Sequence, residues 1–209
     1  MSWNNLGKLN ERPIAMTDLE TSGDMPCGCP AHTRDPQFSN QTKDWGKLGH
    51  EILEIGLVVF DQSTFEILST YEAKVKPLHI ENAVPAALER NGYKEEDWQT
   101  AIFLEQAMQV YGEKTKDCIF CAYNVSFDWS FVNQAFWQNK IQNPMSTREN
   151  HDRLDLLSIA WERGLKKEKN LSLQNACQLF GVPSEPFPHS ALNGAMTAYE
   201  LFKKLSLGK

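Results

Sequence analysis

The sequence has no apolar run near the roughly 20 residues that a transmembrane helix needs, which argues against an integral membrane protein. Residues 1–12 also lack the apolar segment of a secretory signal, so we expect a loose polar leader there. Basic residues do not predominate: 21 Lys and Arg face 27 Asp and Glu, giving a net charge of −6. This balance is not typical of a protein that binds nucleic acid over its whole surface. It does not exclude a nucleic-acid enzyme in which metal ions neutralise phosphate locally.

Cysteine is scarce and odd in number, with five residues in 209. A disulfide scaffold is therefore not expected, and a reducing cytoplasmic location fits the composition best. Cys118 and Cys121 lie on an expected strand, where positions three apart face opposite sides, so they are predicted to be separate core residues. Cys27, Cys29 and His32 are spaced more tightly than usual zinc ligands and lack an obvious fourth partner. We therefore expect an ordinary loop there rather than a zinc site.

Apolar runs and turn residues predict one α/β domain over residues 13–209, with strands first and helices later. The expected strands cover residues 13–21, 51–60, 65–76, 118–123 and 153–157. The expected helices cover residues 85–91, 98–116, 128–139, 157–163, 172–180 and 190–205. Residues 22–49 form a long polar loop insertion without periodicity, and residues 183–188 form a proline-rich connector.

The stretch around which the chain is organised ends the first strand with two carboxylates, Asp18 and Glu20. Side chains alternate along a strand, so these two acids share one face while Leu19 points to the other. Two acids on one face repel each other unless a proton or a cation lies between them. Mg²⁺ and Mn²⁺ prefer such oxygen ligands. The sequence thus suggests a metal site, with two solvated acids at a strand terminus as the alternative.

Two later motifs match this pair. Asn124 precedes Phe127 and Asp128 where a strand passes into a helix, and His189 opens the segment 189–195 at the start of the last helix. With residues 18–21, these motifs resemble the DEDDh exonucleases, the family of the DnaQ proofreading subunit and ribonuclease T. The segments 54–56 and 153–155 are also similar to family patterns. The resemblance covers about residues 14–205.

The resemblance implies a ribonuclease H-like fold, in which helices flank a five-stranded mixed sheet. It also implies a 3′–5′ exonuclease that hydrolyses the terminal phosphodiester of single-stranded DNA or RNA and releases nucleoside 5′-monophosphates. Two Mg²⁺ or Mn²⁺ ions would hold the attacking and leaving oxygens on opposite sides of phosphorus. A polymerase or a second copy of the chain is a further partner consistent with the family.

By resemblance, Asp18 would bridge both ions, Glu20 would hold one, and Asp128 would support the site directly or through water. His189 would be the general base that takes a proton from the attacking water. The alternative for His189 is a helix-start histidine without a ligand role. The implied substrate-binding residues are Leu19, Thr21, Asn124 and Phe127.

One position departs from the family pattern, because Gly194 stands where the family carries its fourth acid. Without that carboxylate we expect weaker binding of one ion and lower turnover. Neither nearby candidate replaces it: Asn193 should point about 100° away around the helix, and Glu200 lies beyond the next turn. The chain is then a weakened or altered exonuclease, a catalytically silent module that binds nucleic acid or a partner, or a substituted form of an active parent.

Overall fold

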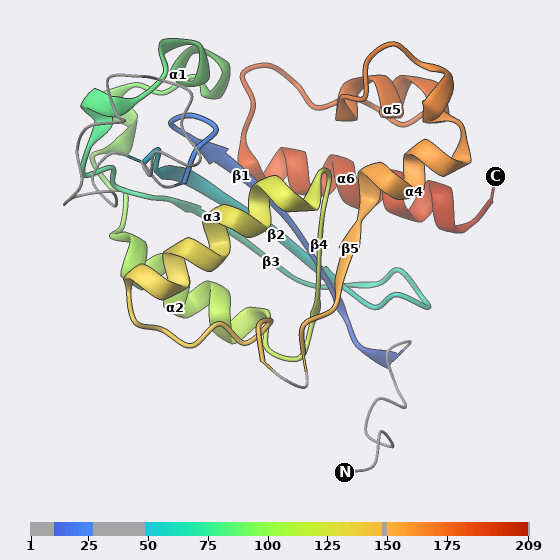
Figure 1. Ribbon diagram of the computed structural model, residues 1–209, viewed down its shortest axis with the longest axis horizontal. Coiled ribbons are helices and arrows are strands. Elements are labelled where there is room, and N and C mark those ends of the chain that lie inside the picture. The colour runs from blue at the N-terminus through green and yellow to red at the C-terminus, as the bar shows by residue number, and fades with distance from the viewer. Residues whose placement is uncertain (1–10, 27–48, 148–149, 209) are drawn as a thin grey trace.

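The computed structural model of the protein describes residues 11–26, 49–147 and 150–208. Its centre is a five-stranded sheet with the order β3-β2-β1-β4-β5 (Figure 1). The strands are β1 Ile14–Thr21, β2 Ile52–Phe60, β3 Ile67–Lys74, β4 Ile119–Ala122 and β5 Arg153–Asp155. β2 pairs with both β1 and β3 in antiparallel orientation, whereas β4 runs parallel to β1 and β5 runs parallel to β4. This is the expected five-stranded mixed sheet.

Helices cover both faces of the sheet (Figure 1). The α-helices are α1 Pro85–Asn91, α2 Leu104–Lys114, α3 Val125–Gln138, α4 Leu156–Arg163, α5 Leu173–Phe180 and α6 Ala191–Ser206. Short 3₁₀ helices are η5 Ile80–Asn82, η6 Glu95–Trp98 and η7 Leu165–Lys167. Within these described residues, no helix is both long enough and apolar enough to cross a bilayer.

Two separate hydrophobic clusters fill the space between the sheet and its helices. Alternation along β1 sends Ala15 and Leu19 to the cluster under α2 and α3, and Ile14 and Met16 to the cluster under α4 and α6. The two cysteines near β4 follow the same rule. Cys118, just before the strand, belongs to the first cluster, and Cys121, within it, belongs to the second. The prediction that they are separate core residues is confirmed.

The prediction of a helix over residues 98–116 is wrong for its first part, because α2 covers only Leu104–Lys114. Trp98 ends η6, and its indole N–H donates to the backbone oxygen of Leu53 at 3.2 Å. Ile102 forms an isolated bridge with Val75, so α2 does not start before Leu104. Pairing with a distant strand therefore overrides the helical spacing of the apolar residues in this segment.

The long loop expected over residues 22–49 lies mostly outside the described residues, and so do Cys27, Cys29 and His32. Its two ends are described and lie side by side. The Ser22 N–H donates to the Glu51 carbonyl at 2.8 Å, and the His50 N–H donates to the Met25 carbonyl at 2.6 Å. The loop thus leaves and rejoins the sheet at the end of β1.

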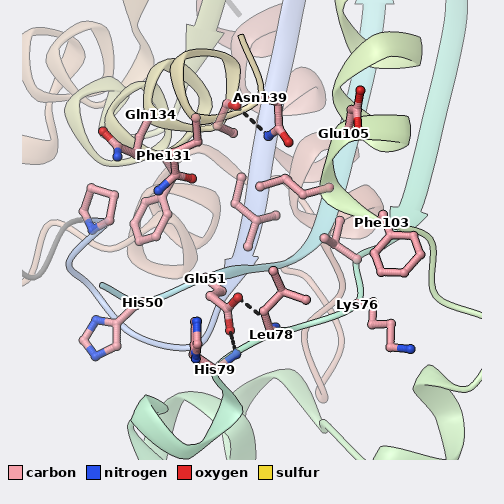
Figure 2. Close-up of a pocket in the computed structure, with 16 residues that line it drawn as sticks. His50, Glu51, Lys76, Leu78, His79, Phe103, Glu105, Phe131, Gln134 and Asn139 are labelled. Carbon is pink, nitrogen blue, oxygen red and sulfur yellow. Dashed lines mark hydrogen bonds between the residues drawn. The ribbon is translucent and has the colours of Figure 1, made fainter. Parts of the chain in front are cut away.

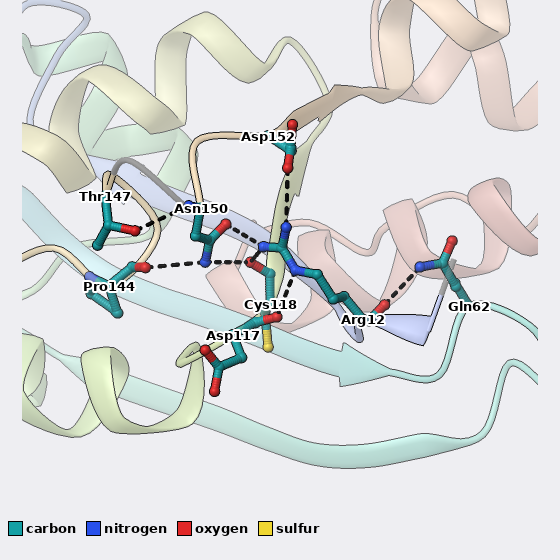
Figure 3. Close-up of polar contacts among 8 residues, drawn as sticks. All are labelled: Arg12, Gln62, Asp117, Cys118, Pro144, Thr147, Asn150 and Asp152. Carbon is teal, nitrogen blue, oxygen red and sulfur yellow. Dashed lines mark hydrogen bonds and ion pairs between the residues drawn. The ribbon is translucent and has the colours of Figure 1, made fainter. Parts of the chain in front are cut away.

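Arg12, which the sequence places in the leader, is held by a network of hydrogen bonds (Figure 3). Its guanidinium donates to the carbonyls of Asp117 and Cys118 at 3.0 and 2.9 Å, and to Asp152 Oδ2 at 3.0 Å. It also donates to Asn150 Oδ1. The fixed fork of the guanidinium lets one side chain tie the start of β1 to the segments before β4 and β5. Ordered structure therefore includes Arg12, and residues 1–10 of the expected leader lie outside the described residues.

Replacing Arg12 by alanine is expected to lower the free energy of unfolding by about 3 kcal/mol, because it leaves several acceptors without their charged donor. For a chain of this size, the melting temperature should fall by about 6–12 °C. Thermal unfolding followed by circular dichroism measures the change. Arg12→Lys should fall between the two, and Arg163→Ala, at an exposed helix end, should change little. An unchanged melting temperature in Arg12→Ala would contradict the anchoring role.

Candidate active site

A cleft of about 810 Å³ lies at the carboxyl end of β1. Helices α1 and α5 lie on the same side of the molecule as this end of the strand (Figure 1). The predicted site residues that line the cleft are Asp18, Leu19, Glu20, Thr21, Phe127 and His189. Asp128 is buried beside the cleft, where its side chain accepts the Leu19 N–H. Asn124 is exposed and does not line the cleft. The structure thus gathers all the predicted site residues except Asn124 around one hollow.

Helix α6 approaches the sheet closely at this point. Gly56 of β2 lies opposite Asp18 of β1, and a Cβ atom at Gly56 would collide with the backbone carbonyl of Ala191. Only glycine permits this contact, which places the first turn of α6 directly against the strands. The same contact brings Gly194 next to Asp18.

Gly194 lies at the position that the sequence assigned to a fourth acid. A Cβ atom there would lie 2.6 Å from Cγ of Asp18 and would collide with its Oδ2. The carboxylate of Asp18 therefore occupies the space into which any side chain at position 194 would extend. Glycine at this position is required for the present orientation of Asp18.

Asp128 lies in the first turn of α3, which begins at Val125, three residues earlier than expected. Its side chain is 3% exposed, and its Oδ1 accepts the Leu19 N–H at 3.1 Å. This bond joins α3 to β1 between the two acids of the first motif. Asn124 occupies the N-cap position of α3. Its backbone is in the left-handed conformation, with φ of 64°, which asparagine tolerates better than most residues.

The acids of the cleft strongly perturb one another. Burial raises the pKa of Asp18 above its ordinary value, and the charges of Asp128 and Glu185 raise it further. Burial likewise raises the pKa of Asp128. Burial and then the charges of Asp18, Glu185 and Glu54 raise the pKa of Glu20 to about 9. Such a cluster needs protons or cations to neutralise it, and its carboxylate oxygens fit hard divalent ions.

Glu185 belongs to this cluster, although the sequence interpretation treated its segment as a connector. Its Oε1 accepts the Ser190 N–H at 3.0 Å, and its Oε2 lies 3.3 Å from Nδ1 of His189. One ligand atom from each of Glu20, Glu185 and His189 lies within 4.8 Å of the other two. The available sequence signal was an acid between Pro183 and Pro186, four residues before the histidine of the third motif.

A second hollow, of about 480 Å³, has a lining that shares no residue with the first (Figure 2). His50, Glu51, Lys76, Leu78 and His79 line it with residues of α2 and α3. Both carboxylate oxygens of Glu51 accept backbone N–H groups, from Leu78 and His79, at 2.8 Å. Glu51 therefore fixes the loop that follows β3. None of the predicted site residues lines this hollow.

Comparison with known proteins agrees with this geometry. The family model described as Exonuclease, RNase_T, matches residues 16–202, which include most of β1, all of α3 and most of α6. The chain belongs to this exonuclease family. DEDDh members of the family typically use divalent metal ions, which fits the oxygen cluster of the cleft. The fold is likewise ribonuclease H-like, as expected from the resemblance.

Among the family's relatives, 3′-5′ exonuclease DinG of Staphylococcus aureus (strain USA300) is 27% identical over 164 residues, covering 75% of this chain and 17% of that protein. E. coli Exonuclease I in complex with a dT13 oligonucleotide has a TM-score of 0.69 and 16% identity, covering 93% of this chain and 41% of that one. A further structure of Exonuclease I has a TM-score of 0.71 and 15% identity, covering 95% of this chain and 41% of that one. The chain thus spans about a sixth of the curated relatives and about two fifths of the solved structures.

The acid cluster predicts how the stability of the protein depends on pH. The pKa of Glu20 is about 9 in the metal-free fold and lies near its ordinary lower value in the unfolded chain. Since the folded state holds this proton more tightly, the contribution of Glu20 to stability is fully present below about pH 5 and is lost as the pH rises to about 9. Divalent cations relieve the same repulsion and compete with the protons for the carboxylates.

We therefore expect Mn²⁺ at about 100 times its Kd to raise the melting temperature by about 5–10 °C near pH 8. The increase should be much smaller near pH 5, where protons occupy the carboxylates. Differential scanning fluorimetry across pH, with and without Mn²⁺, measures both effects. Equal shifts at both pH values would contradict the interpretation, and Glu20→Gln should flatten the pH dependence of the metal-free protein.

Proposed function

We propose that this chain is a metal-dependent 3′–5′ exonuclease that removes nucleoside 5′-monophosphates from the 3′ ends of single-stranded DNA or RNA. The observation that carries the proposal is the convergence of Asp18 and Glu20 of β1 with Asp128 of α3, at a cleft that His189 also lines. Membership of the exonuclease family and the likeness to 3′-5′ exonuclease DinG support it.

Asp18 and Glu20 would hold two Mg²⁺ or Mn²⁺ ions, with Asp128 supporting the site from behind Leu19. When bound, these ions would neutralise the phosphate and stabilise the charge that develops during hydrolysis. His189 would accept a proton from the attacking water, whose oxygen forms the new bond to phosphorus. The bond from phosphorus to the 3′ oxygen of the preceding nucleotide breaks, and that oxygen takes up a proton.

The ring of His189 is suited to this task by its contacts. Its Nδ1 faces Glu185 at 3.3 Å, which leaves Nε2 free to accept a proton from water. The backbone N–H of His189 donates to the Arg90 carbonyl at 3.1 Å, so α1 helps to fix the segment before α6. The histidine itself is 40% exposed, so water can reach it.

The cleft also offers groups that suit a single-stranded end. Phe127 and Phe187 line it, and Phe187 is 72% exposed, which leaves its ring free to stack on a base. Arg90 lines the cleft as well and provides a positive charge for a phosphate. Leu19 and Thr21, which alternate with the two acids along β1, also line the cleft and would contact the terminal nucleotide.

The proposal is tested with 5′-labelled single-stranded DNA and RNA oligonucleotides of equal length, each incubated with Mg²⁺ or Mn²⁺. The expected result is a ladder that shortens from the 3′ end, with nucleoside 5′-monophosphates as the products. A blank reaction with EDTA controls for metal dependence. If neither substrate is shortened with either metal, the chain is instead a silent binding module, the second candidate that Gly194 favours.

The setting of the activity belongs to the proposal too. A reducing cytoplasmic compartment suits Cys118, Cys121 and Cys177, which are all buried as free thiols. A second copy of the chain or a polymerase would be the protein partner. Light scattering after size-exclusion chromatography distinguishes a homodimer from a monomer, and the rate on DNA relative to RNA defines the preferred substrate.

Gly194 permits a specific prediction about activity. Replacing it by alanine should lower turnover by about 10²-fold, because the added Cβ displaces the carboxylate of Asp18 by about an ångström or more. Gly194→Asp introduces the same Cβ, so it should not exceed the activity of the parent chain. Single-turnover assays measure both variants. A Gly194→Asp enzyme that is at least about 10 times faster than the parent would show instead that the chain simply lacks the family's fourth acid.

A further inference from the structure

We propose that Glu185 supplies the carboxylate that the family pattern places at position 194, and so acts as the fourth acidic ligand of the metal site. This inference rests on the proposed function, because it assigns a residue to the same divalent-ion site. It differs from the family pattern in the origin of the ligand, which comes from the segment before α6 rather than from the helix itself.

The first argument is geometric. A carboxylate oxygen of Glu185 lies within 4.8 Å of ligand atoms of both Glu20 and His189, so one ion could contact Glu20 and Glu185 beside the His189 ring. The charge of Glu185 also acts on both Asp18 and Glu20, which places it with the acids of the first motif. Position 194 cannot supply an acid while Asp18 keeps its present orientation.

The second argument concerns Glu20, the partner that Glu185 faces. Its side chain is 6% exposed, and no group in the described part of the chain donates a hydrogen bond to its carboxylate. Its oxygens therefore reach the cleft, where Asp18, Glu185 and Glu54 repel its charge. Arg90 is the one cation among the described residues that opposes them. A largely buried carboxylate among other acids is costly unless a cation or a proton compensates for it. The oxygens of Glu20, which lie near Glu185, therefore point to an ion between the two residues.

The third argument is that Glu185 is held in place for this role. Its side chain is only 10% exposed, and Oε1 is fixed by the Ser190 N–H at the start of α6. Ser190 is also the N-cap of α6, where its side chain accepts the N–H of Asn193. The helix end thus positions the carboxylate before any ion binds, while the second lone pairs of its oxygens stay available as ligands.

Metal binding tests the assignment without relying on activity. Mn²⁺ binding to the full chain is measured by titration calorimetry and by electron paramagnetic resonance, for the parent, Glu185→Gln and Glu200→Gln. Glutamine keeps an oxygen for the Ser190 N–H but removes the charge, and Glu200 is an exposed acid on α6 itself. We expect two ions in the parent and in Glu200→Gln, and at least a 10-fold loss of affinity for one ion in Glu185→Gln.

Each result is decisive. If Glu185→Gln binds both ions as tightly as the parent while its turnover falls, Glu185 only positions His189, and the assignment is overturned although the exonuclease proposal stands. If the parent binds no Mn²⁺, both proposals fail together. Circular dichroism establishes that each variant is folded, and Glu185→Asp, which keeps the charge on a shorter side chain, should retain part of the lost affinity.

Discussion

Asp18→Asn is expected to reduce turnover of a single-stranded oligonucleotide by at least about 10³-fold, which corresponds to about 4 kcal/mol of transition-state stabilisation. Asp18 lies at the centre of the acid cluster, between Gly194 of α6 and the buried Asp128. Asparagine has nearly the same shape but lacks the charge that would bridge two cations. The fold should therefore survive while the site loses its central ligand.

The measurement is a single-turnover assay at saturating Mn²⁺, with thermal unfolding measured in parallel. Asp97→Asn, an exposed position in η6, is a matched control that should keep the parent's activity. Because the substitution removes one of several mutually repelling acids, the metal-free Asp18→Asn protein should also be more stable than the parent near pH 8. A variant that retains more than about a tenth of the parent's turnover would contradict the role of Asp18.

The strand that carries Asp18 and Glu20, and the face that they share, could be predicted from local geometry. Alternation on a strand puts both acids on one face, and the apolar residues before them identify the strand itself. Asp128 could be placed for a similar reason, since it lies where a strand passes into a helix. The bond from the Leu19 N–H to Asp128 could not be foreseen, because it joins residues 109 positions apart.

Glu185 was missed for the opposite reason. It lies in an irregular segment between α5 and α6, where no periodicity relates one side chain to another. Its position depends on how this segment crosses the end of β1, which is a property of the tertiary structure. The start of α2 was misplaced for the same kind of reason, because the bridge from Ile102 to Val75 connects segments that are distant in sequence.

Gly194 shows how a departure from a family pattern gains meaning from the structure. In the sequence it indicates only a missing acid and a weakened site. In the structure its lack of a side chain provides the space that the carboxylate of Asp18 occupies. The absence of a side chain at position 194 and the orientation of Asp18 are thus two aspects of one arrangement, and Glu185 lies near the same acids beside His189.

His189→Ala is expected to lower turnover by about 10²–10⁴-fold, the usual contribution of a positioned general base. Its ring is exposed enough to meet water, and Glu185 fixes its orientation through Nδ1. If the loss reflects a missing base rather than a damaged site, added imidazole should restore part of the activity, because a small base can enter the space that the side chain leaves. The expected signature is a rate that rises with imidazole concentration in His189→Ala and stays constant in the parent.

Three comparisons make this result specific. His151→Ala removes an exposed histidine just before β5 and should neither lose activity nor respond to imidazole. Mn²⁺ binding to His189→Ala should remain close to that of the parent if the ring acts on water, and should weaken if the ring is itself an ion ligand. Since Glu185 contacts the same ring, His189→Ala combined with Glu185→Gln separates the two roles. A base held by a positioning carboxylate predicts that the double variant loses little more activity than His189→Ala alone, whereas a metal-ligating Glu185 predicts a further fall.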